Sequence, residues 1–216
     1  MKIYSYLCIK EWIMLKNNSS TIYRQELKGK ILDTAMGMFQ EKGIRRVKMD
    51  DIAQKLSISK RTLYEIYENK EQLLYEGVQY HHQMLGEHIR QFAQGARNEI
   101  EIVMEAMRCN LNYLGHVNPL FFSELRKYER VLSFLQENRE EQRDNSILFL
   151  KSGVEHGYFR KDINYDIVTN MGDAIMNYVM ESKMYEKYPL SEIFTNYVNV
   201  MFRGICTEKG LAELKL

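Results

Sequence analysis

Residues 59–64 place two cations and three hydroxyl groups next to one another. Their order is Ser59, Lys60, Arg61, Thr62 and, after one leucine, Tyr64. Ammonium and guanidinium groups bind phosphate, arginine can also donate two hydrogen bonds to the edge of a guanine, and hydroxyl groups can bind either partner. This short segment therefore has the chemistry to hold a polyanion, and it offers no arrangement that would break a covalent bond.

Two further lysines lie close by, Lys48 before the segment and Lys70 after it. Between Arg24 and Lys70 there are eleven Lys or Arg against seven Asp or Glu, a net charge of +4, although the whole chain carries only +1. A local excess of positive charge is typical of a surface that meets a polyanion. A solvated surface of mixed charge would give the same count, so charge alone leaves both interpretations open.

Helical periodicity supplies the elements that would position these groups. Apolar residues recur at helical spacing on a first helix that ends near Gly43, on a second helix over 49–56 and on a third over 60–67. Gly43 suits the left-handed end of a helix, and Ser59 is the predicted N-cap of the third one. The third helix turns three side chains toward a core: Leu63, Ile66 and Tyr67.

The rest of the chain predicts longer amphipathic helices. One of them begins at Lys70, is capped by Asn69 and runs toward Gly95. Asn118 followed by Pro119 is typical of a helix start, because proline is favoured at the first helical position. The later helices are expected over 98–115, 119–128, 131–156, 164–187 and 191–207.

Composition favours an all-α protein. Of 216 residues, 45% are hydrophobic and 27% charged, and there are only two prolines and 12 glycines. No apolar run reaches the length of about 18 residues that a membrane span needs. The apolar run over 3–9 is short for a signal peptide and contains two tyrosines. We expect a cytoplasmic protein that is not bound to a membrane, and translation from Met1 or from Met14 stays open.

Cysteine and histidine spacing predicts neither a metal nor a cofactor. Cys8, Cys109 and Cys206 lie about a hundred residues apart, without a Cys-x-x-Cys pair. His81 and His88 share one helix face but lack the His-x-x-x-His spacing of a strong zinc signal. The chain also contains no P-loop, no Gly-x-Ser-x-Gly and no Gly-x-Gly-x-x-Gly motif. We therefore expect no enzyme.

Residues 24–75 resemble the DNA-binding region of the TetR family of bacterial transcriptional regulators. The resemblance is carried, in order, by Lys42-Gly43, MDDIA at 49–53, ISKRTLY at 58–64 and YENKEQL at 67–73. It implies a helix-turn-helix head whose third helix enters the major groove of double-stranded DNA. The residues expected at base edges are Lys60, Arg61 and Thr62. The residues expected at phosphates are Lys48, Ser59, Tyr64 and Lys70.

Two positions depart from the family's pattern. Lys48 stands where family members often carry Thr or Ser, and a lysine side chain cannot accept the capping hydrogen bond of the second helix. Ser57 stands where a turn glycine is usual. Because serine adopts left-handed backbone angles less readily than glycine, this turn is expected to be strained or differently shaped.

The resemblance also implies an organisation for the whole chain. It gives an N-terminal extension over 1–21, whose order stays open, a DNA-binding head over 22–70 and a helical effector-binding and dimerisation domain over 71–216. The implied function is that of a ligand-responsive repressor that binds a palindromic operator as a homodimer. The two subunits would pair through the apolar faces of their last two long helices. The sequence does not identify the pocket of the small-molecule effector. An activator, a ligand-independent regulator and a helical small-molecule-binding protein without DNA binding remain as alternatives.

Overall fold

The computed structural model describes residues 4–214, with side chains described from Tyr23 onward. Within this range all regular structure is helical, apart from one isolated β-bridge between Phe159 and Cys206. The prediction of an all-α protein is therefore confirmed. The elements follow one another as α1 Tyr4–Lys42, α2 Met49–Lys55, α3 Lys60–Ile66, α4 Lys70–Gly95, α5 Glu99–His116, α6 Pro119–Leu125, α7 Glu129–Glu155, α8 Tyr165–Glu181, a 3₁₀ turn Met184–Glu186, α9 Leu190–Ile205 and α10 Glu208–Glu213.

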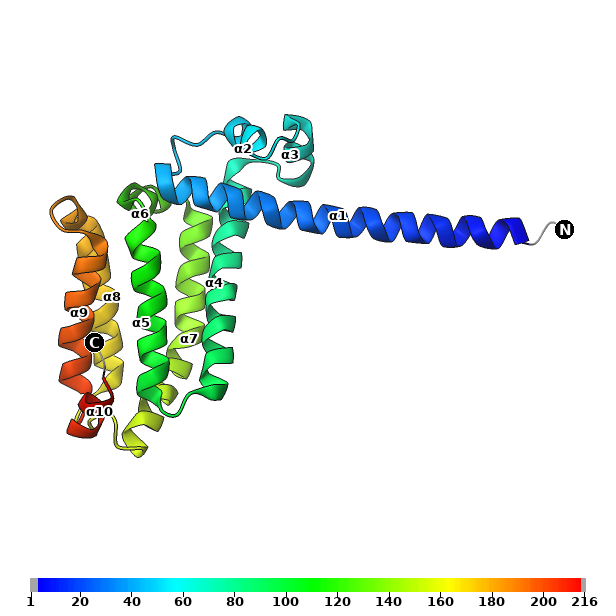
Figure 1. Ribbon diagram of the computed structural model, residues 1–216. Coiled ribbons are helices and arrows are strands. Elements are labelled where there is room, and N and C mark those ends of the chain that lie inside the picture. The colour runs from blue at the N-terminus through cyan, green and yellow to red at the C-terminus, as the bar shows by residue number, and fades with distance from the viewer. Residues whose placement is uncertain (1–3, 215–216) are drawn as a thin grey trace.

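Figure 1 shows a small head joined to a larger helical part by one continuous helix. The head consists of α2, α3 and the adjoining part of α1, and α4 runs from it into the long helices α5, α7, α8 and α9. The helix α4 starts at Asn69, whose side chain accepts a hydrogen bond from the backbone N–H of Gln72. Head and helical part are thus connected through α4 itself, which is stiffer than a Gly/Ser linker.

Buried side chains form two clusters. The first joins α1, α2, α3 and the start of α4 to α6 and the beginning of α7, and Phe39, Leu63 and Leu73 within it are fully buried. The second joins α5, α8 and α9 and includes Ile100 and Phe159. Fully burying such a side chain contributes about 1.5–3 kcal/mol to folding. Because the first cluster extends into α6 and α7, the head rests on the helical part through a shared core.

The helices α1 and α4 approach each other closely at Gly77. A Cβ atom placed on Gly77 would lie 2.5 Å from Sδ of Met36, a separation that no side chain could keep without moving Met36. Glycine therefore allows the head and α4 to pack more closely than any other residue would.

The predicted helix ends agree well with the structure. Gly43 follows α1 with a φ of 84°, and its N–H donates to the carbonyl oxygen of Phe39. Asn118 accepts a hydrogen bond from the N–H of Leu120, with Pro119 in the first turn of α6. These ends are fixed by local chemistry, which is why spacing and residue type were enough to find them.

The order of the extension over 1–21 was left open by the sequence, and the helix α1 continues back to Tyr4 through most of it; residues 1–3 lie outside the described part. Two elements differ from the sequence prediction. The helix predicted over 164–187 ends at Glu181, because Lys183 takes a left-handed φ of 52°. The short α10 was not predicted. Its cap Thr207 donates to the carbonyl oxygen of Gly157, a contact made by the tertiary fold.

In the part of the chain that the structure describes, no helix combines the length and the apolar character needed to cross a membrane.

Candidate nucleic-acid interface and internal cavity

The helix α3 presents one face to the core and the other to solvent. Leu63 and Tyr67 are fully buried, and Ile66 packs against the same cluster, so the predicted inward face is confirmed. On the outward face Thr62 is partly buried and the other members are exposed. This outward face of α3 consists of Ser59, Lys60, Arg61, Thr62 and Tyr64. The fold therefore brings five of the seven predicted site residues together on one surface.

The hydroxyl groups of Ser59 and Thr62 fix the first turn of α3. Ser59 Oγ accepts a hydrogen bond from the backbone N–H of Thr62 at 3.0 Å and lies 2.8 Å from Thr62 Oγ1. This is the side-chain cap that the sequence predicted. Because the cap sets the backbone of the first turn, it also sets the points at which Lys60 and Arg61 leave the helix.

Both cations of the outward face are paired with carboxylates of the head. Lys60 binds Asp50 of α2, and Arg61 Nε lies 2.8 Å from Glu65 Oε1 on α3 itself. The hydrogen bond to Asp50 raises the pKa of Lys60, and that to Glu65 raises the pKa of Arg61. Exposed ion pairs contribute only about 0–1 kcal/mol, whereas a bidentate contact to a base provides about 1–3 kcal/mol of discrimination. Neither ion pair would therefore strongly oppose an exchange of the carboxylate for another anion.

Lys48 occupies the N-cap of α2 with an exposed side chain. Its side chain makes no capping hydrogen bond, as the sequence predicted, but its backbone N–H donates to Asp51 Oδ2 at 2.8 Å. This is the reciprocal half of a capping box, in which the third residue of the helix satisfies the N-cap backbone. The ammonium group takes no part in the cap and is free to meet a phosphate.

Lys70 is held differently from what the phosphate prediction assumed. Its Nζ donates to the backbone carbonyl oxygens of Ile44 and Val47, at 2.9 and 3.0 Å. Burial lowers the pKa of Lys70. An ammonium group has three hydrogens, so a phosphate contact would rest on the third. No local sequence pattern pointed to these contacts, because the carbonyls belong to a loop more than twenty residues earlier.

The turn between α2 and α3 has the shape that glycine usually provides. Ser57 adopts a left-handed φ of 55°, and its N–H still donates to the carbonyl oxygen of Gln54. Left-handed angles cost an L-residue roughly 1–2 kcal/mol. The substitution has therefore kept the turn and introduced strain, which is one of the two outcomes expected from the sequence.

Sequence reasoning missed two contacts that hold the head in place. Arg24 Nη2 on α1 donates to the carbonyl oxygen of Glu65 on α3, at 3.2 Å. The backbone N–H of Arg45 donates to Glu124 Oε2 on α6, at 2.8 Å. Their partners are 41 and 79 residues away along the chain, so no local pattern could have revealed them.

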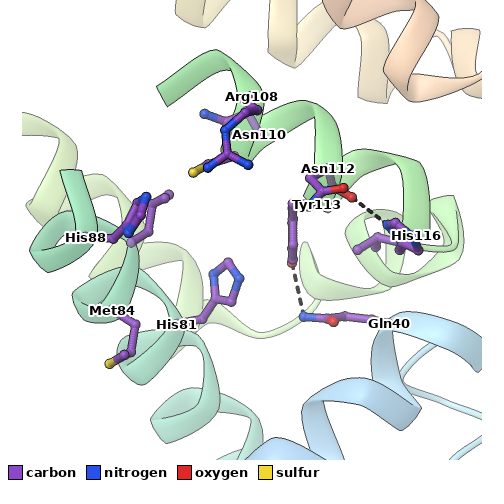
Figure 2. Close-up of a pocket in the computed structure, with 12 residues that line it drawn as sticks. Gln40, His81, Met84, His88, Arg108, Asn110, Asn112, Tyr113 and His116 are labelled. Atoms are coloured by element: carbon purple, nitrogen blue, oxygen red, sulfur yellow. Dashed lines mark hydrogen bonds between the residues drawn. The ribbon is translucent and has the colours of Figure 1, made fainter. Parts of the chain in front are cut away.

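An open cavity of about 630 Å³ lies between α4 and α5, with Gln40 of α1 at one end. Figure 2 shows His81 and His88 on α4 across from Arg108 and Tyr113 on α5. The full lining is Gln40, His81, Met84, Leu85, His88, Arg108, Cys109, Asn110, Asn112, Tyr113, His116 and Val117. Its mixture of apolar, cationic and amide groups suits a small molecule with both apolar and polar parts.

The cavity continues toward the head. A neighbouring hollow of about 220 Å³ lies between α1 and α4 and shares Gln40, His81 and Met84 with it. Gln40 Nε2 donates to the hydroxyl of Tyr113 at 3.4 Å, and burial raises the pKa of Tyr113 to about 12. The cavity therefore touches both helices that carry the head, α1 and α4.

Known proteins are similar to the head and to much of the rest of the chain. A family model described as "Bacterial regulatory proteins, tetR family" matches residues 31–76. The HTH-type transcriptional repressor KstR2 of Mycobacterium tuberculosis is 25% identical over 146 residues, which cover 65% of this chain and 73% of the relative. The chain belongs to the TetR family. It is therefore a DNA-binding transcriptional regulator.

Other comparisons agree with this TetR-family assignment. The negative transcriptional regulator IcaR of the biofilm operon icaADBC, from Staphylococcus epidermidis, is 40% identical over 53 residues, 24% of this chain and 29% of the relative. The structure of Mycobacterium tuberculosis KstR2 superposes with a TM-score of 0.58 at 23% identity, over 84% of this chain and 95% of that one. The structure of a transcriptional regulator from Saccharomonospora viridis in complex with choline superposes with a TM-score of 0.69 at 15% identity, over 85% of this chain and 100% of that one. These likenesses establish the fold, a helix-turn-helix head followed by a helical domain.

Proposed function

We propose that this TetR-family regulator is a ligand-responsive repressor that binds a palindromic operator as a homodimer. The observation that carries the proposal is the outward face of α3, defined above, which presents donors opposite a face that packs into the core. Lys60, Arg61 and Thr62 would contact base edges in the major groove. Phosphate contacts would come from Ser59, Tyr64, Lys48 and the remaining hydrogen of Lys70. Two relatives, KstR2 and IcaR, are named as negative regulators, which supports repression.

The dimer would form through α8 and α9. Apolar residues recur on α8 at Ile167, Met171 and Tyr178, and they expose 56%, 51% and 64% of their surface; Val200 on α9 exposes 74%. Soluble monomers rarely leave such a stripe uncovered. These helices lie on the side of the molecule remote from α4 (Figure 1). A two-fold axis there would set the two α3 helices about one DNA turn, roughly 34 Å, apart.

The effector would occupy the cavity between α4 and α5. Gln40 reaches the cavity from α1 and also accepts, through its backbone oxygen, a hydrogen bond of 2.7 Å from the N–H of Asn118. A ligand that moves α4 away from α1 would therefore displace both helices that hold the head, α1 and α4. Release from DNA requires that the ligand bind the DNA-free spacing of the heads more tightly, because a ligand shifts an equilibrium only by its differential affinity.

We place the DNA-binding head at 22–70 and the effector-binding and dimerisation domain at 71–216. The shared core, to which Leu73, Leu74 and Val78 of α4 belong, supports a rigid junction at this boundary. A displacement of α4 in the cavity would then reach α3 without being absorbed by a flexible linker.

The replacement Arg61→Ala tests the DNA-binding face. DNA next to the gene supplies the candidate operator, and fluorescence anisotropy measures affinity for it and for an unrelated duplex over a range of salt concentrations. We expect Arg61→Ala to lose about 1–3 kcal/mol on the operator and little on the unrelated duplex, because a base contact carries the specificity. The exposed Lys55→Ala on α2 is the matched control for loss of one cation.

Two outcomes of this experiment contradict the proposal. An equal loss on both duplexes would make Arg61 a phosphate contact instead of a base contact. If the unmodified protein shows no salt-dependent binding to any duplex, the proposed operator binding fails altogether.

A further inference from the structure

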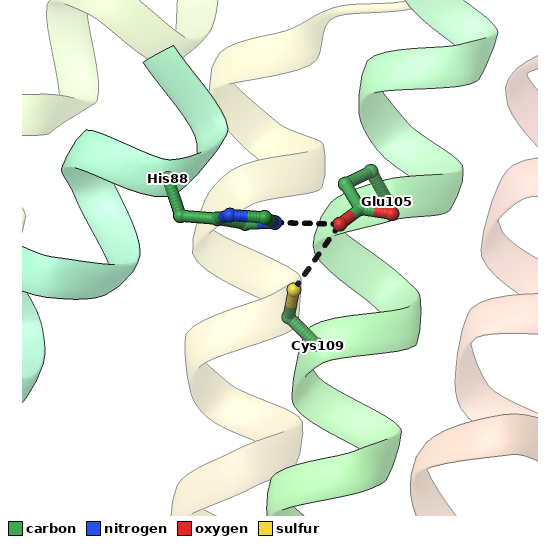
Figure 3. A group of neighbouring side chains, drawn as sticks. All are labelled: His88, Glu105 and Cys109. Carbon is green, nitrogen blue, oxygen red and sulfur yellow. Dashed lines mark hydrogen bonds and ion pairs between the residues drawn. The ribbon is translucent and has the colours of Figure 1, made fainter. Parts of the chain in front are cut away.

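Three side chains with metal-binding atoms meet where α4 passes α5, away from the DNA-binding face. His88 comes from α4, while Glu105 and Cys109 lie one turn apart on the same face of α5. Figure 3 shows the three groups turned toward one another. One ligand atom from each residue can be chosen so that all three lie within 4.8 Å of one another.

We propose that His88, Glu105 and Cys109 form a binding site for a divalent cation of the zinc class. Imidazole nitrogen, carboxylate oxygen and thiolate sulfur are the ligands that zinc uses in proteins, and three protein ligands leave a fourth position for water or a small molecule. The sequence predicted no metal because His88 was compared with His81. In the fold, the His81 ring instead lies 4.6 Å from the Tyr113 ring.

One pair of these ligand atoms already has the spacing that a tetrahedral zinc ion requires, and all three lie within 4.8 Å of one another. Cys109 Sγ lies 3.7 Å and His88 Nε2 lies 2.6 Å from Glu105 Oε1. With bonds of about 2.0–2.3 Å, neighbouring ligand atoms around tetrahedral zinc are about 3.3–3.8 Å apart. The sulfur–oxygen separation fits without change. The imidazole must withdraw by about 1 Å, which is possible because the His88 side chain is 50% exposed.

The surroundings favour a bound cation with one open coordination position. Glu105 is only 7% exposed, so its charge is poorly screened by water. His88 and Cys109 also line the cavity of about 630 Å³, which provides a route of entry and space for the fourth ligand. The cation would thus be held from the protein side and open on the cavity side.

Arg108 is the group that competes with the cation. Its Nε lies 2.8 Å from Glu105 Oε2 and its Nη2 lies 2.6 Å from Oε1. The side chain of Arg108 is 64% exposed, so it can rotate into solvent, and a bound cation would then replace its charge beside Glu105. On binding, the cation would therefore take the place of Arg108 as the charged partner of Glu105.

The ionisation states of the ligands are compatible with binding. Hydrogen bonds from Arg108 and His88 hold the pKa of Glu105 at about 2, so the carboxylate is charged at neutral pH. Burial and the nearby Glu105 charge raise the pKa of Cys109. The thiol must therefore lose its proton to solvent when the sulfur–metal bond forms, as metal-bound cysteines do.

A cation at this position would tie α4 to α5 beside the proposed effector cavity. It would thereby restrain the helix that carries the head and change operator affinity. This consequence rests on the proposed function, whereas the metal site itself does not.

Cobalt(II) is a suitable probe, because it takes zinc's coordination and absorbs light. The metal-free full-length protein is titrated with Co²⁺, and the thiolate-to-cobalt band is followed by absorption, with Zn²⁺ as competitor. We expect the band in the unmodified protein and its loss in Cys109→Ser. His88→Gln and Glu105→Gln should each weaken Co²⁺ binding by more than about 10-fold, the smallest loss found for groups that only support a ligand. Arg108→Gln should bind Co²⁺ more tightly.

Controls separate the site from other thiols and from unfolding. Cys8→Ser and Cys206→Ala should keep the band, and circular dichroism checks that every variant remains helical. A band that survives in Cys109→Ser, an absence of any band, or equal Co²⁺ affinity in Glu105→Gln and the unmodified protein would overturn the site and leave only an ion pair between α4 and α5.

Operator binding with and without Zn²⁺ then tests the coupling. A zinc effect that is present in the unmodified protein and absent in Cys109→Ser supports it. Metal binding without any effect on operator affinity overturns the coupling but not the site, whereas failure to bind DNA even without metal overturns the proposed function.

Discussion

In the head, Phe39, Leu63 and Tyr67 expose none of their surface, whereas in the helical part Met171 and Tyr178 expose 51% and 64% of theirs. The helical part also keeps a cavity of about 630 Å³ between α4 and α5. Close packing leaves a helix such as α3 one position, because every displacement would create voids or clashes. A cavity and an uncovered face leave contacts that a ligand or a second subunit can still make.

This difference separates two tasks in one chain. Recognition of DNA needs donors held in fixed positions, and the head provides them on a helix whose inner side chains, Leu63 and Tyr67, are fully buried. Response to a signal needs an element that can take up more than one arrangement, and α4 lies between that core and the cavity. The proposed division of labour follows from packing and does not depend on the identity of the effector.

The largest expected difference between the two regions is in the effect of shortening one apolar side chain in each. Leu63→Ala removes a fully buried side chain beneath α3 and is expected to cost about 2–5 kcal/mol of unfolding free energy. Ile167→Ala on α8 should change the stability of the monomer by less than about 0.5 kcal/mol. Guanidinium unfolding measures the first effect. Sedimentation velocity should show a smaller dimer fraction for Ile167→Ala only, and equal destabilisation by both replacements would mean that this face of α8 is core.

Acid should act on the helical part before the head. The buried carboxylates of the described residues, Glu99 and Glu105, both belong to α5. Arg108 and His88 lower the pKa of Glu105 from 4.5 to about 2. The charged carboxylate therefore contributes fully to the free energy of unfolding above pH 4.5, and this contribution is lost as the pH falls to about 2. We expect this contribution to be about 1–2 kcal/mol, since both partners are exposed.

The variant Glu105→Gln sharpens the acid prediction. In metal-free protein its stability should lie below that of the unmodified protein at pH 6 and approach it toward pH 2, as followed by urea unfolding at each pH. The exposed Glu137→Gln is the matched control and should show no such convergence. A stability difference for Glu105→Gln that stays constant with pH would contradict a role for its charge.

The smallest expected effect concerns one strained residue in each region. In the described chain, Ser57 in the head and Lys183 after α8 are the non-glycine residues with positive φ, at 55° and 52°. Ser57→Gly and Lys183→Gly should each raise the free energy of unfolding by about 0.5 kcal/mol. Glycine removes the backbone strain, but it also loses more conformational entropy on folding. Thermal unfolding measures both. Ser57→Ala should give no gain, and a gain equal to that of Ser57→Gly would show that the turn is not strained.

Much of the head could be predicted because its signals are local. The apolar spacing of α2 and α3, the cap at Ser59 and the left-handed Gly43 each depend on residues within one or two turns. The same holds for α4 to α7, whose predicted ends agree with the structure to within a few residues. The predicted end of α8 was wrong, because the helix stops before Lys183, which has a left-handed φ. The helix α10 was not predicted, because it depends on the contact of Thr207 with Gly157.

The candidate site was predictable as a set of residues but not as a set of contacts. Helical spacing placed Lys60, Arg61 and Tyr64 on one face, and that face is the one observed. The partners Asp50 and Glu65 were not foreseen, and neither were the carbonyl oxygens that hold Lys70.

The sequence alone determined that this protein is helical, that a helix-turn-helix head lies near its N-terminus and which side chains face outward on α3, because these properties arise from neighbours within a few turns. The tertiary structure decided the rest. It turned Lys70 inward, placed Gln40 of α1 in the cavity and brought His88 to Glu105 and Cys109. Such contacts join residues on different helices, and their formation depends on how whole helices pack, which no local pattern records.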